Sequence, residues 1–329
     1  MSSRDSKTTQ STLAFEEVAY LEANLDVANA VKLGIVKSGF AHWIEHGKAE
    51  KRPLNAFNTR KYKVFHSLNK LGKGLEIGPS HNPIAPKREG YDVQIVDHTT
   101  AEILRDKYKS HGLNLANIEV VDFVWEGQPL SELIGRTECY DWIIASHVIE
   151  HIPDLISFLQ ECSKLLKPTG VMSLVVPDKR YCFDYFQPLT STGNLLDAHQ
   201  ERRQRPSAGK IFDHLANACS KQSSIAWAKD TVGDLNLVHG IEQAQETWRL
   251  AQQNDDYVDV HCWRFTPSSF ELIIQDLQQL ELLNLGYKVG FDTSGCEFYV
   301  SLERKKAGGT SKFKSRLDLH KAIRKEELG

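Results

Sequence analysis

The stretch GLEIGPSHNPI, residues 74–84, decides the fold of this chain. It is a short apolar run that contains an acidic residue and ends in a glycine before a tight turn. Such a turn lets backbone N–H groups and a helix N-terminus come close to a ligand. Four more β-rich runs follow it: YDVQIVD (91–97), NIEVVD (117–122), YDWIIAS (140–146) and GVMSLVVP (170–177). Helical segments separate these runs, and strands that alternate with helices predict parallel βαβ units in an α/β doubly wound sheet.

Changes in composition divide the chain into predicted parts. They are an N-terminal helical leader (1–73), a Rossmann-like sheet domain (74–177 and 263–303), an insertion after the fifth strand (178–262) and a basic mobile tail (304–329). The clearest predicted helix, PDLISFLQECSKLLKPTG (153–170), has Pro at its start and Lys-Pro-Thr-Gly as a stop. The runs LELLNLGYKV (280–289) and CEFYVSLER (296–304) predict a terminal strand pair. We therefore expect a mostly parallel sheet of seven strands, with helices on both faces and the last strand antiparallel.

Charge and composition exclude several classes of protein. The net charge of the 329 residues is -3, so the chain has no global field that would attract nucleic acid. A membrane span and a secretory signal are not expected, because no apolar stretch is long enough, and we predict a cytoplasmic protein. The six cysteines are scattered without metal-type spacing, which predicts reduced thiols. The tail (304–329) is basic enough to contact an acidic partner or a membrane surface. The composition leaves the oligomeric state open.

Two further acidic residues follow the second and third predicted strands. Asp97 comes about twenty residues after the first turn, the spacing at which a carboxylate can accept hydrogen bonds from both ribose hydroxyls. Asp122 ends the third run, where an adenine amino group could find an acceptor, although it could equally cap a helix. Ser80 and Asn82 stand where dinucleotide-binding proteins have glycines. The missing GxGxxG pattern therefore disfavours a nicotinamide-dependent oxidoreductase.

The segment after the fourth run carries a family resemblance. Ser146-His147-Val148-Ile149-Glu150-His151 is followed by Ile-Pro-Asp (152–154) and then by Leu-Leu-Lys-Pro-Thr-Gly (165–170). With these segments the chain resembles the class I S-adenosylmethionine-dependent methyltransferases. The resemblance implies that S-adenosylmethionine is the cofactor. The residues it implies for cofactor binding are Glu76, Gly78, Pro79, Ser80, Asp97, His98, Asp122, Phe123, Ser146 and His147.

The resemblance also assigns parts of the cofactor to these residues. Glu76 and Gly78 would line the methionine end and Asp97 the ribose, Asp122 with Phe123 would frame the adenine, and Ser146 with His147 would lie beside the sulfonium. Ser80 departs from the family, which often has a second glycine there, so it puts the geometry of the loop in doubt.

A narrower resemblance points to the methyl acceptor. Gly-Pro-Ser-His-Asn-Pro (78–83) and Val-Pro-Asp-Lys-Arg-Tyr (176–181) are similar to methyltransferase-like proteins of bacterial surface-polysaccharide gene clusters. This implies O-methylation of a sugar or a saccharide-containing acceptor. An amino group of a nucleic-acid base is disfavoured, because the Asn- or Asp-Pro-Pro-Tyr segment of enzymes with that activity is absent. The alternative is a non-catalytic, cofactor-binding scaffold or a partner module of a polysaccharide-assembly complex.

Transfer of a methyl group to an alcohol requires a group that takes up the hydroxyl proton. We favour His147 as this base, with Asp178 and His261 as reserves, because His147 and Asp178 follow the predicted fourth and fifth strands and His261 belongs to the insertion. The insertion is expected to cover the bound acceptor. The substrate-binding residues predicted at its start are Lys179, Arg180, Tyr181 and Asp184. No metal site is expected, since His147 and His151 have no obvious third ligand in the sequence.

Overall fold

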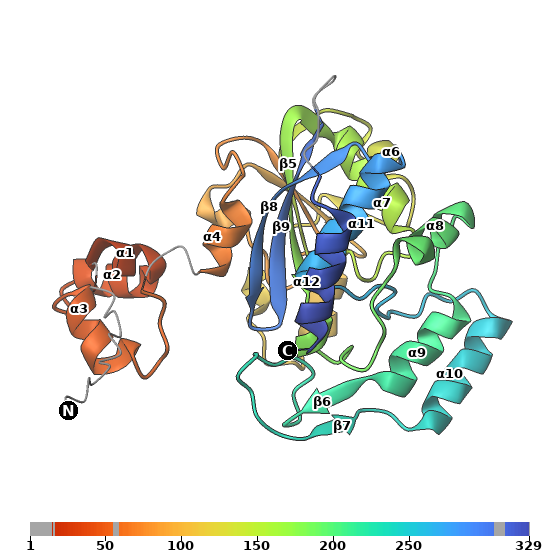
Figure 1. The fold of residues 1–329 in the computed structure, drawn as a ribbon. Helices are drawn as coiled ribbons and strands as arrows, with labels where there is room; N and C mark the ends of the chain where they lie inside the picture. Colours follow the sequence, from red (N-terminus) through yellow and green to blue (C-terminus); the bar gives the residue numbers. More distant parts are fainter. Residues whose placement is uncertain (1–14, 16, 55–58, 306–312, 329) are drawn as a thin grey trace, which may run out of the picture. The chain divides into compact units, whose positions relative to one another are not determined.

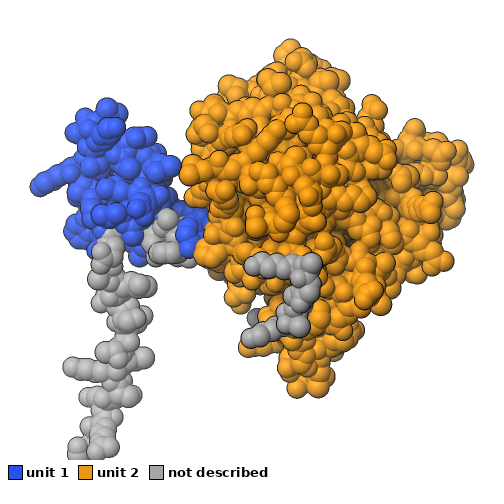
Figure 2. All heavy atoms as spheres, turned by 90° about the horizontal axis from the view of Figure 1, so that it is seen from above, with its two compact units in different colours: residues 1–63 blue, residues 64–329 orange. Residues whose placement is uncertain are grey.

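The computed structural model describes residue 15 and residues 17–54, 59–305 and 313–328. The chain forms two compact units, residues 1–63 and residues 64–329 (Figure 2). The first unit contains α1 (Glu17–Ala23), α2 (Leu25–Lys32), α3 (Gly39–His42) and a π-helical turn, η1 (Trp43–Gly47). Its boundary falls ten residues before the expected one. The reason is that Val64, Phe65 and Leu68 are buried in the core of the second unit.

The second unit is built on a seven-stranded sheet with the order β3-β2-β1-β4-β5-β9-β8. The strands are β1 (Gly74–Ile77), β2 (Val93–Asp97), β3 (Phe123–Val124), β4 (Tyr140–Ser146), β5 (Leu166–Pro177), β8 (Leu285–Ser294) and β9 (Glu297–Arg304). The first five are parallel to one another, and β9 runs antiparallel to both β5 and β8. The predicted α/β Rossmann-like fold is therefore confirmed (Figure 1).

The central strand β4 explains why the sheet is covered on both faces. Its successive side chains point to opposite sides, as strand geometry requires. Ile143 and Ala145 join the larger core cluster, which contains residues of helices α7 (Leu155–Leu165) and α11 (Pro267–Gln279). Trp142 and Ile144 join a second cluster that includes Phe65 of helix α4 (Arg60–Phe65). A strand buried on both sides has to be apolar throughout, which is why YDWIIAS is so clear a signal.

Helix α7 begins where its sequence predicts but ends before the predicted stop. Asp154 caps its start, because the Asp154 carboxylate accepts a hydrogen bond from the Ser157 N–H at 3.0 Å. The helix ends at Leu165, and the Lys-Pro-Thr-Gly stop lies inside β5, which begins at Leu166 rather than at Gly170.

The third strand differs from its prediction. Residues 117–122 lie outside any strand, and β3 consists only of Phe123 and Val124. The Asp122 carboxylate accepts a hydrogen bond from the backbone N–H of Ile95 at 2.7 Å, while the Asp122 N–H donates to the Ile95 carbonyl. The Asp122 side chain therefore takes the hydrogen bond of the Ile95 N–H, a donor of β2 that a longer β3 would use.

The remaining helices of the second unit surround the sheet. They are α5 (Ala101–Tyr108), α6 (Leu130–Ile134) and α12 (Arg316–Leu328), with short 3-10 turns η3 (Lys87–Glu89), η4 (Leu115–Asn117) and η5 (Lys179–Tyr181). The prediction of a mobile tail is wrong for α12, which lies along α11 in Figure 1. The Glu326 carboxylate accepts hydrogen bonds from the Ser268 N–H and hydroxyl, and Arg316 forms an ion pair with Asp276. The prediction depended on the basic charge of residues 304–329. The contacts of Glu326 and Arg316 with α11 order the helix despite that charge.

The insertion after β5 forms a subdomain of its own. It contains α8 (Thr192–Gln200), α9 (Ala208–Asn217), the antiparallel pair β6 (Cys219–Lys221) and β7 (Leu235–Leu237), and α10 (Ile241–Gln253). Helices α9 and α10 lie side by side (Figure 1). Leu195 and Ala198 of α8 are buried in the main core, which anchors the insertion to the sheet domain. Within the part of the chain that the structure describes, no helix is long and apolar enough to cross a membrane.

Candidate functional site

The parallel strands bring the predicted cofactor residues to one edge of the sheet. Ile77 of β1 pairs with Val96 of β2 and with Ala145 of β4. The residues that follow these three, Gly78, Asp97 and Ser146, therefore lie at the carboxyl ends of neighbouring strands, where open α/β sheets bind their ligands.

The loop after β1 has two residues in the left-handed region. Gly78 has φ +64°, and a Cβ atom there would lie only 2.8 Å from Cγ2 of Val148. Ser80 has φ +50°, which few side chains adopt. Its N–H donates to the Asp97 carboxylate at 2.9 Å and its hydroxyl hydrogen-bonds to the Tyr108 hydroxyl at 3.0 Å. These two contacts hold the loop where the resemblance expects a second glycine.

The Glu76 side chain holds the end of this loop through hydrogen bonds. It is 1% exposed, and its carboxylate oxygens accept hydrogen bonds from the backbone N–H groups of Ile84 at 2.7 Å and Ala85 at 3.0 Å. A buried carboxylate that receives two backbone donors is satisfied within the protein. The geometry thus favours a role in shaping the loop over the expected contact with the methionine end of the cofactor.

Asp97 is buried but keeps acceptor capacity. One oxygen accepts from the Ser80 N–H, and the other lies 2.8 Å from the His98 N–H and 2.7 Å from the His98 ring Nδ1. A carboxylate has about four lone-pair positions, so hydroxyl donors can still be accepted. The His98 side chain is exposed beside it. Asp97 and His98 thus remain suitable for the role that the resemblance implies.

Asp122 has a structural role that the sequence did not predict. Besides the Ile95 N–H, its carboxylate binds the ammonium group of Lys87 at 2.6 Å. These contacts tie β2 and η3 together, but both fall on Oδ2 and the side chain is 27% exposed, so the other carboxylate oxygen remains suitable for the adenine contact that the resemblance implies. Phe123, which follows it, is half-buried against the main core. Pro79 also lies half-buried in the loop after β1.

His147 lies directly after β4 in an unusual conformation. Its φ is +53°, a left-handed value for a residue with a Cβ, and strain of this kind tends to mark functional sites. Its Nε2 is 2.7 Å from a carboxylate oxygen of Glu297, and its Nδ1 is 3.7 Å from Oε1 of Glu150. Its side chain remains 37% exposed. The structure thus gives His147 a carboxylate partner and leaves it accessible.

Glu297 is a residue that sequence reasoning missed. It begins β9, 150 residues from His147. The predicted antiparallel pairing of the last strand could have found it, because Glu297 stands opposite Pro177 at the end of β5.

The structure argues against Asp178 as a base. The Asp178 carboxylate is fully buried, and it accepts hydrogen bonds from the Arg180 guanidinium at 2.6 and 2.9 Å and from the Thr293 hydroxyl at 2.6 Å. Burial lowers the pKa of Arg180, but the hydrogen bonds and charge of Asp178 outweigh it and raise that pKa. A substrate cannot reach a carboxylate held in this way.

The same holds for most of the predicted substrate-binding residues. Arg180 is bound to Asp178 and to the Glu326 carbonyl, and Lys179 donates to the Tyr185 carbonyl at 3.0 Å from a buried position. Burial lowers the pKa of Lys179. Tyr181 and Arg180 are only partly buried, and the Arg180 guanidinium lies over the Tyr181 ring. Lys179 and Arg180 thus anchor the start of the insertion, because their charged groups bind partners inside the protein.

Asp184 and His261 form a buried pair. His261 Nδ1 lies 2.5 Å from Asp184 Oδ2, and Arg264 lies on the other Asp184 oxygen at 3.5 Å. Burial would raise the pKa of Asp184, but the charge and hydrogen bond of His261 and the charge of Arg264 hold it below its usual range. Asp184 is 1% and His261 5% exposed, so a direct contact with an acceptor is disfavoured for both residues.

His261 belongs to a cluster with Glu150 and His151. One ligand atom from each of the three lies within 4.8 Å of those of the other two. His151 Nδ1 is 2.7 Å from the Asp259 carboxylate. Burial lowers the pKa of His151, yet the Asp259 hydrogen bond and the Glu150 charge outweigh it, so that pKa lies above its usual value.

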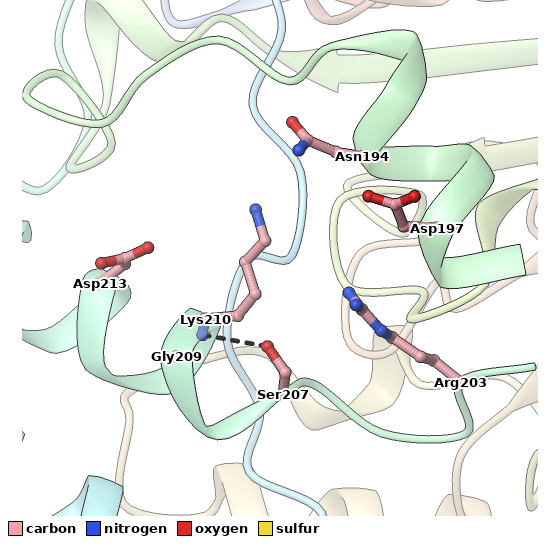
Figure 3. Close-up of a pocket in the computed structure, with 7 residues that line it drawn as sticks. All are labelled: Asn194, Asp197, Arg203, Ser207, Gly209, Lys210 and Asp213. Atoms are coloured by element: carbon pink, nitrogen blue, oxygen red, sulfur yellow. Dashed lines mark hydrogen bonds between the residues drawn. The ribbon is translucent and has the colours of Figure 1, made fainter. Parts of the chain in front are cut away.

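The insertion contains a polar pocket of about 250 Å³ between α8 and α9 (Figure 3). Its lining residues are Asn194, Asp197, Arg203, Ser207, Gly209, Lys210 and Asp213. Lys210 extends into the pocket from α9, and its backbone N–H donates to the Ser207 hydroxyl at 3.3 Å. Its ammonium lies 5.2 Å from the ring centre of Trp263, whose Nε1 donates to the Ile152 carbonyl at 2.6 Å. Lys210 thus links the wall of the pocket to Trp263, which in turn hydrogen-bonds to the segment after β4.

Comparison with known proteins finds a protein family that matches this chain. A model described as a methyltransferase domain matches residues 49–278, more than half of the chain. A ubiquinone biosynthesis O-methyltransferase of Rhodopseudomonas palustris is 27% identical over 124 residues, 38% of this chain and 46% of the relative. One from Histophilus somni is 31% identical over 130 residues, 37% of this chain and 52% of the relative. The matches thus span about half the length of these curated relatives.

Among solved structures, an S-adenosylmethionine-dependent methyltransferase of Mesorhizobium loti is 13% identical. The match covers 73% of this chain and 95% of that one, with a TM-score of 0.36. A likeness at this level does not bear on activity.

Proposed function

The chain belongs to the methyltransferase domain family, with S-adenosylmethionine as its cofactor, and on that premise we propose that it methylates a hydroxyl oxygen of a saccharide-containing acceptor. The observation that supports this most is the position of His147. It follows β4 at the ligand-binding edge of the sheet, and a carboxylate holds one of its ring nitrogens. An accessible histidine with an orienting carboxylate is the arrangement expected of a general base.

The residues at this edge fit the cofactor. The backbone of Gly78 can approach a ligand closely because it has no Cβ, and Asp97 retains acceptor positions for ribose hydroxyls. We propose that His98, Phe123 and Ser146 line the same site. The bound cofactor supplies an electrophilic methyl group. The protein's part is to orient the acceptor in line with it and to exclude water.

In this proposal His147 takes up the proton of the acceptor hydroxyl. A Glu297 carboxylate can only accept a hydrogen bond, so His147 Nε2 carries the proton of their 2.7 Å contact. His147 Nδ1 is then the basic atom that takes the hydroxyl proton as the new C–O bond forms. Glu297 fixes the ring and stabilises the imidazolium that results.

The pocket of the insertion supports a polar acceptor. Asn194, Asp197, Ser207 and Asp213 offer directional hydrogen-bonding groups, and sugar hydroxyls are recognised by such groups. We propose that the insertion contacts the acceptor through this pocket, whose lining residue Lys210 lies over Trp263, the partner of the Ile152 carbonyl after β4. A second candidate acceptor is a phenolic ring, because the relatives described above are named ubiquinone biosynthesis O-methyltransferases.

The test is to incubate the purified full chain with methyl-labelled S-adenosylmethionine and two acceptor panels, saccharides and phenols, and to locate the label by mass spectrometry. We expect label on a saccharide hydroxyl oxygen, and less of it with Asp197→Ala. Label on phenols alone would replace the saccharide by the second candidate. Tight cofactor binding without transfer to any acceptor would instead favour a non-catalytic, cofactor-binding partner module.

A further inference from the structure

Glu150 is a buried carboxylate that the proposed reaction does not use. It follows β4 by four residues and is 0% exposed. Among the residues that the structure describes, none donates a hydrogen bond to either of its carboxylate oxygens. Burial of an ionised carboxylate without donors is costly, so such a group is normally paired or bound to a metal.

Three imidazole nitrogens lie near this carboxylate: Nδ1 of the proposed base His147, at 3.7 Å from Glu150 Oε1, and one nitrogen from each histidine of the cluster described above. His151 Nε2 lies 3.9 Å and His261 Nε2 lies 4.0 Å from the same atom, Glu150 Oε1. These distances are too long for hydrogen bonds. The His151 and His261 rings are perpendicular, with their centres 4.7 Å apart. Three possible ligand atoms therefore surround one point without bonding to one another.

The other nitrogen of each ring is held by a carboxylate. His261 Nδ1 is 2.5 Å from Asp184, and His151 Nδ1 is 2.7 Å from Asp259. A carboxylate accepts the Nδ1 proton, so a neutral ring presents its Nε2 lone pair toward Glu150. Metal-binding histidines characteristically have this arrangement, in which a carboxylate fixes the tautomer and the orientation of the ring.

From this convergence we propose that Glu150, His151 and His261 bind one divalent transition-metal ion of the zinc type. When both rings are neutral, their two lone pairs and the negative oxygen repel one another, and a cation between them removes the repulsion. Two histidines and one glutamate are a recurrent ligand set of zinc sites that keep a fourth position open. Imidazole ligands favour zinc, copper, iron or nickel over magnesium or calcium.

The geometry needs only a small contraction. Zinc–ligand bonds of 2.0–2.2 Å place neighbouring ligands of a tetrahedral site about 3.4 Å apart. The observed distances of 3.9 and 4.0 Å to Glu150 would shorten by about half an ångström on binding. Rotation of three side chains about their χ angles is enough for this change.

The sequence did not predict this site, because His261 lies at the far end of the insertion and no spacing connects it to Glu150 and His151. The expectation of no metal site depended on the lack of a third ligand. The fold supplies that ligand, since the Cys262 and Trp263 N–H groups both donate to the Glu150 carbonyl and keep His261 beside it.

The test is to remove metal from the full-length chain with a chelator and to titrate it with Zn²⁺ and separately with Co²⁺. Calorimetry measures the stoichiometry and affinity for Zn²⁺, and the visible spectrum of Co²⁺ reports its coordination. We expect one ion per chain and the intense bands of four-coordinate Co²⁺. Neither measurement requires an acceptor or methyl transfer, so failure of the metal site and failure of the proposed function are distinguishable.

Variants identify the ligands. Glu150→Gln and His261→Ala should lose at least a hundredfold in Zn²⁺ affinity, and Asp184→Asn or Asp259→Asn should lose 10- to 100-fold, because they free the rings without removing a ligand. His320→Ala, an exposed histidine of α12, is the matched control and should bind like wild type. Circular dichroism verifies that each variant folds. If a variant unfolds, the wild-type stoichiometry and Co²⁺ spectrum remain decisive.

Two results would overturn the proposal. One is that the chelated wild-type chain binds neither ion at micromolar concentration. The other is that Glu150→Gln, folded, binds as tightly as wild type, since the ion would then be held elsewhere.

Discussion

Buried carboxylates at or near the carboxyl ends of neighbouring strands fall into two groups that differ in what surrounds them. Glu76 and Asp97, at the ends of β1 and β2, accept hydrogen bonds from backbone N–H groups of the loops they support. Glu150, just after β4, receives no hydrogen bond on its carboxylate from any described residue and faces three imidazole nitrogens, those of His147, His151 and His261. Position at the edge of the sheet therefore does not decide a carboxylate's role. The first group shapes the loops of the proposed cofactor site, whereas Glu150 has the surroundings of the metal ligand that we propose.

Among the residues at this edge of the sheet, His147 should give the largest loss of activity when it is replaced. His147→Ala removes the proposed base, and loss of a general base typically costs 10²- to 10⁴-fold in rate. Cofactor affinity should remain within about twofold, because the variant leaves Asp97 and Gly78 unchanged. Turnover with labelled cofactor and calorimetric titration of the cofactor measure the two quantities separately. Equal losses in both would move His147 into the cofactor-binding group.

Asp97 tests whether a satisfied carboxylate still binds ligand. Asp97→Ala should weaken binding of S-adenosylmethionine by roughly 2–4 kcal/mol, because charge-assisted hydrogen bonds to ribose hydroxyls are lost and the Ser80 N–H loses its acceptor. Asp97→Asn keeps one acceptor oxygen and should be milder. Calorimetry with the cofactor measures both variants. Unchanged affinity in the Ala variant would exclude β2 from the cofactor site.

Glu76 represents the purely structural end of the comparison. Glu76→Gln replaces one of two acceptor oxygens by an amide NH₂ that faces a backbone donor, and should lower the free energy of unfolding by about 2–3 kcal/mol. Denaturant titration followed by circular dichroism measures this loss. A variant as stable as wild type would show that the hydrogen bonds to Ile84 and Ala85 contribute nothing to the fold.

Glu150→Gln is the matched substitution in the other group and should have the smallest effect on stability. Without metal, the change removes a buried charge that has no donors, so the free energy of unfolding should change by less than about 1 kcal/mol or increase. The same denaturant titration, in chelator, gives the comparison with Glu76→Gln directly. A loss as large as that of Glu76→Gln would mean that Glu150 is already satisfied, and the contrast between the two groups would fail.

The difference in predictability follows from the range of the interactions. The runs 74–78 and 140–146 and the helix after Pro153 were predicted well, because apolar patterning, proline and capping residues act within a few positions. The third strand and the tail were not predicted correctly. In the first case a side chain, Asp122, occupies a donor of β2, and in the second polar contacts to α11 order a basic helix.

By itself the sequence determined the alternation of strands and helices, the family resemblance and the choice of Asp97 and His147, since all of these are encoded by neighbouring residues. Only the tertiary structure decided which carboxylates contact His147 and His151. Glu297 reaches His147 across 150 positions, and Asp259 reaches His151 across 108. Such pairs depend on how the last strand returns beside β5 and how the insertion ends. The physical reason is that a hydrogen bond or a metal ligand requires two atoms within a few ångströms, and spacing along the chain does not encode that distance once a whole subdomain lies between them.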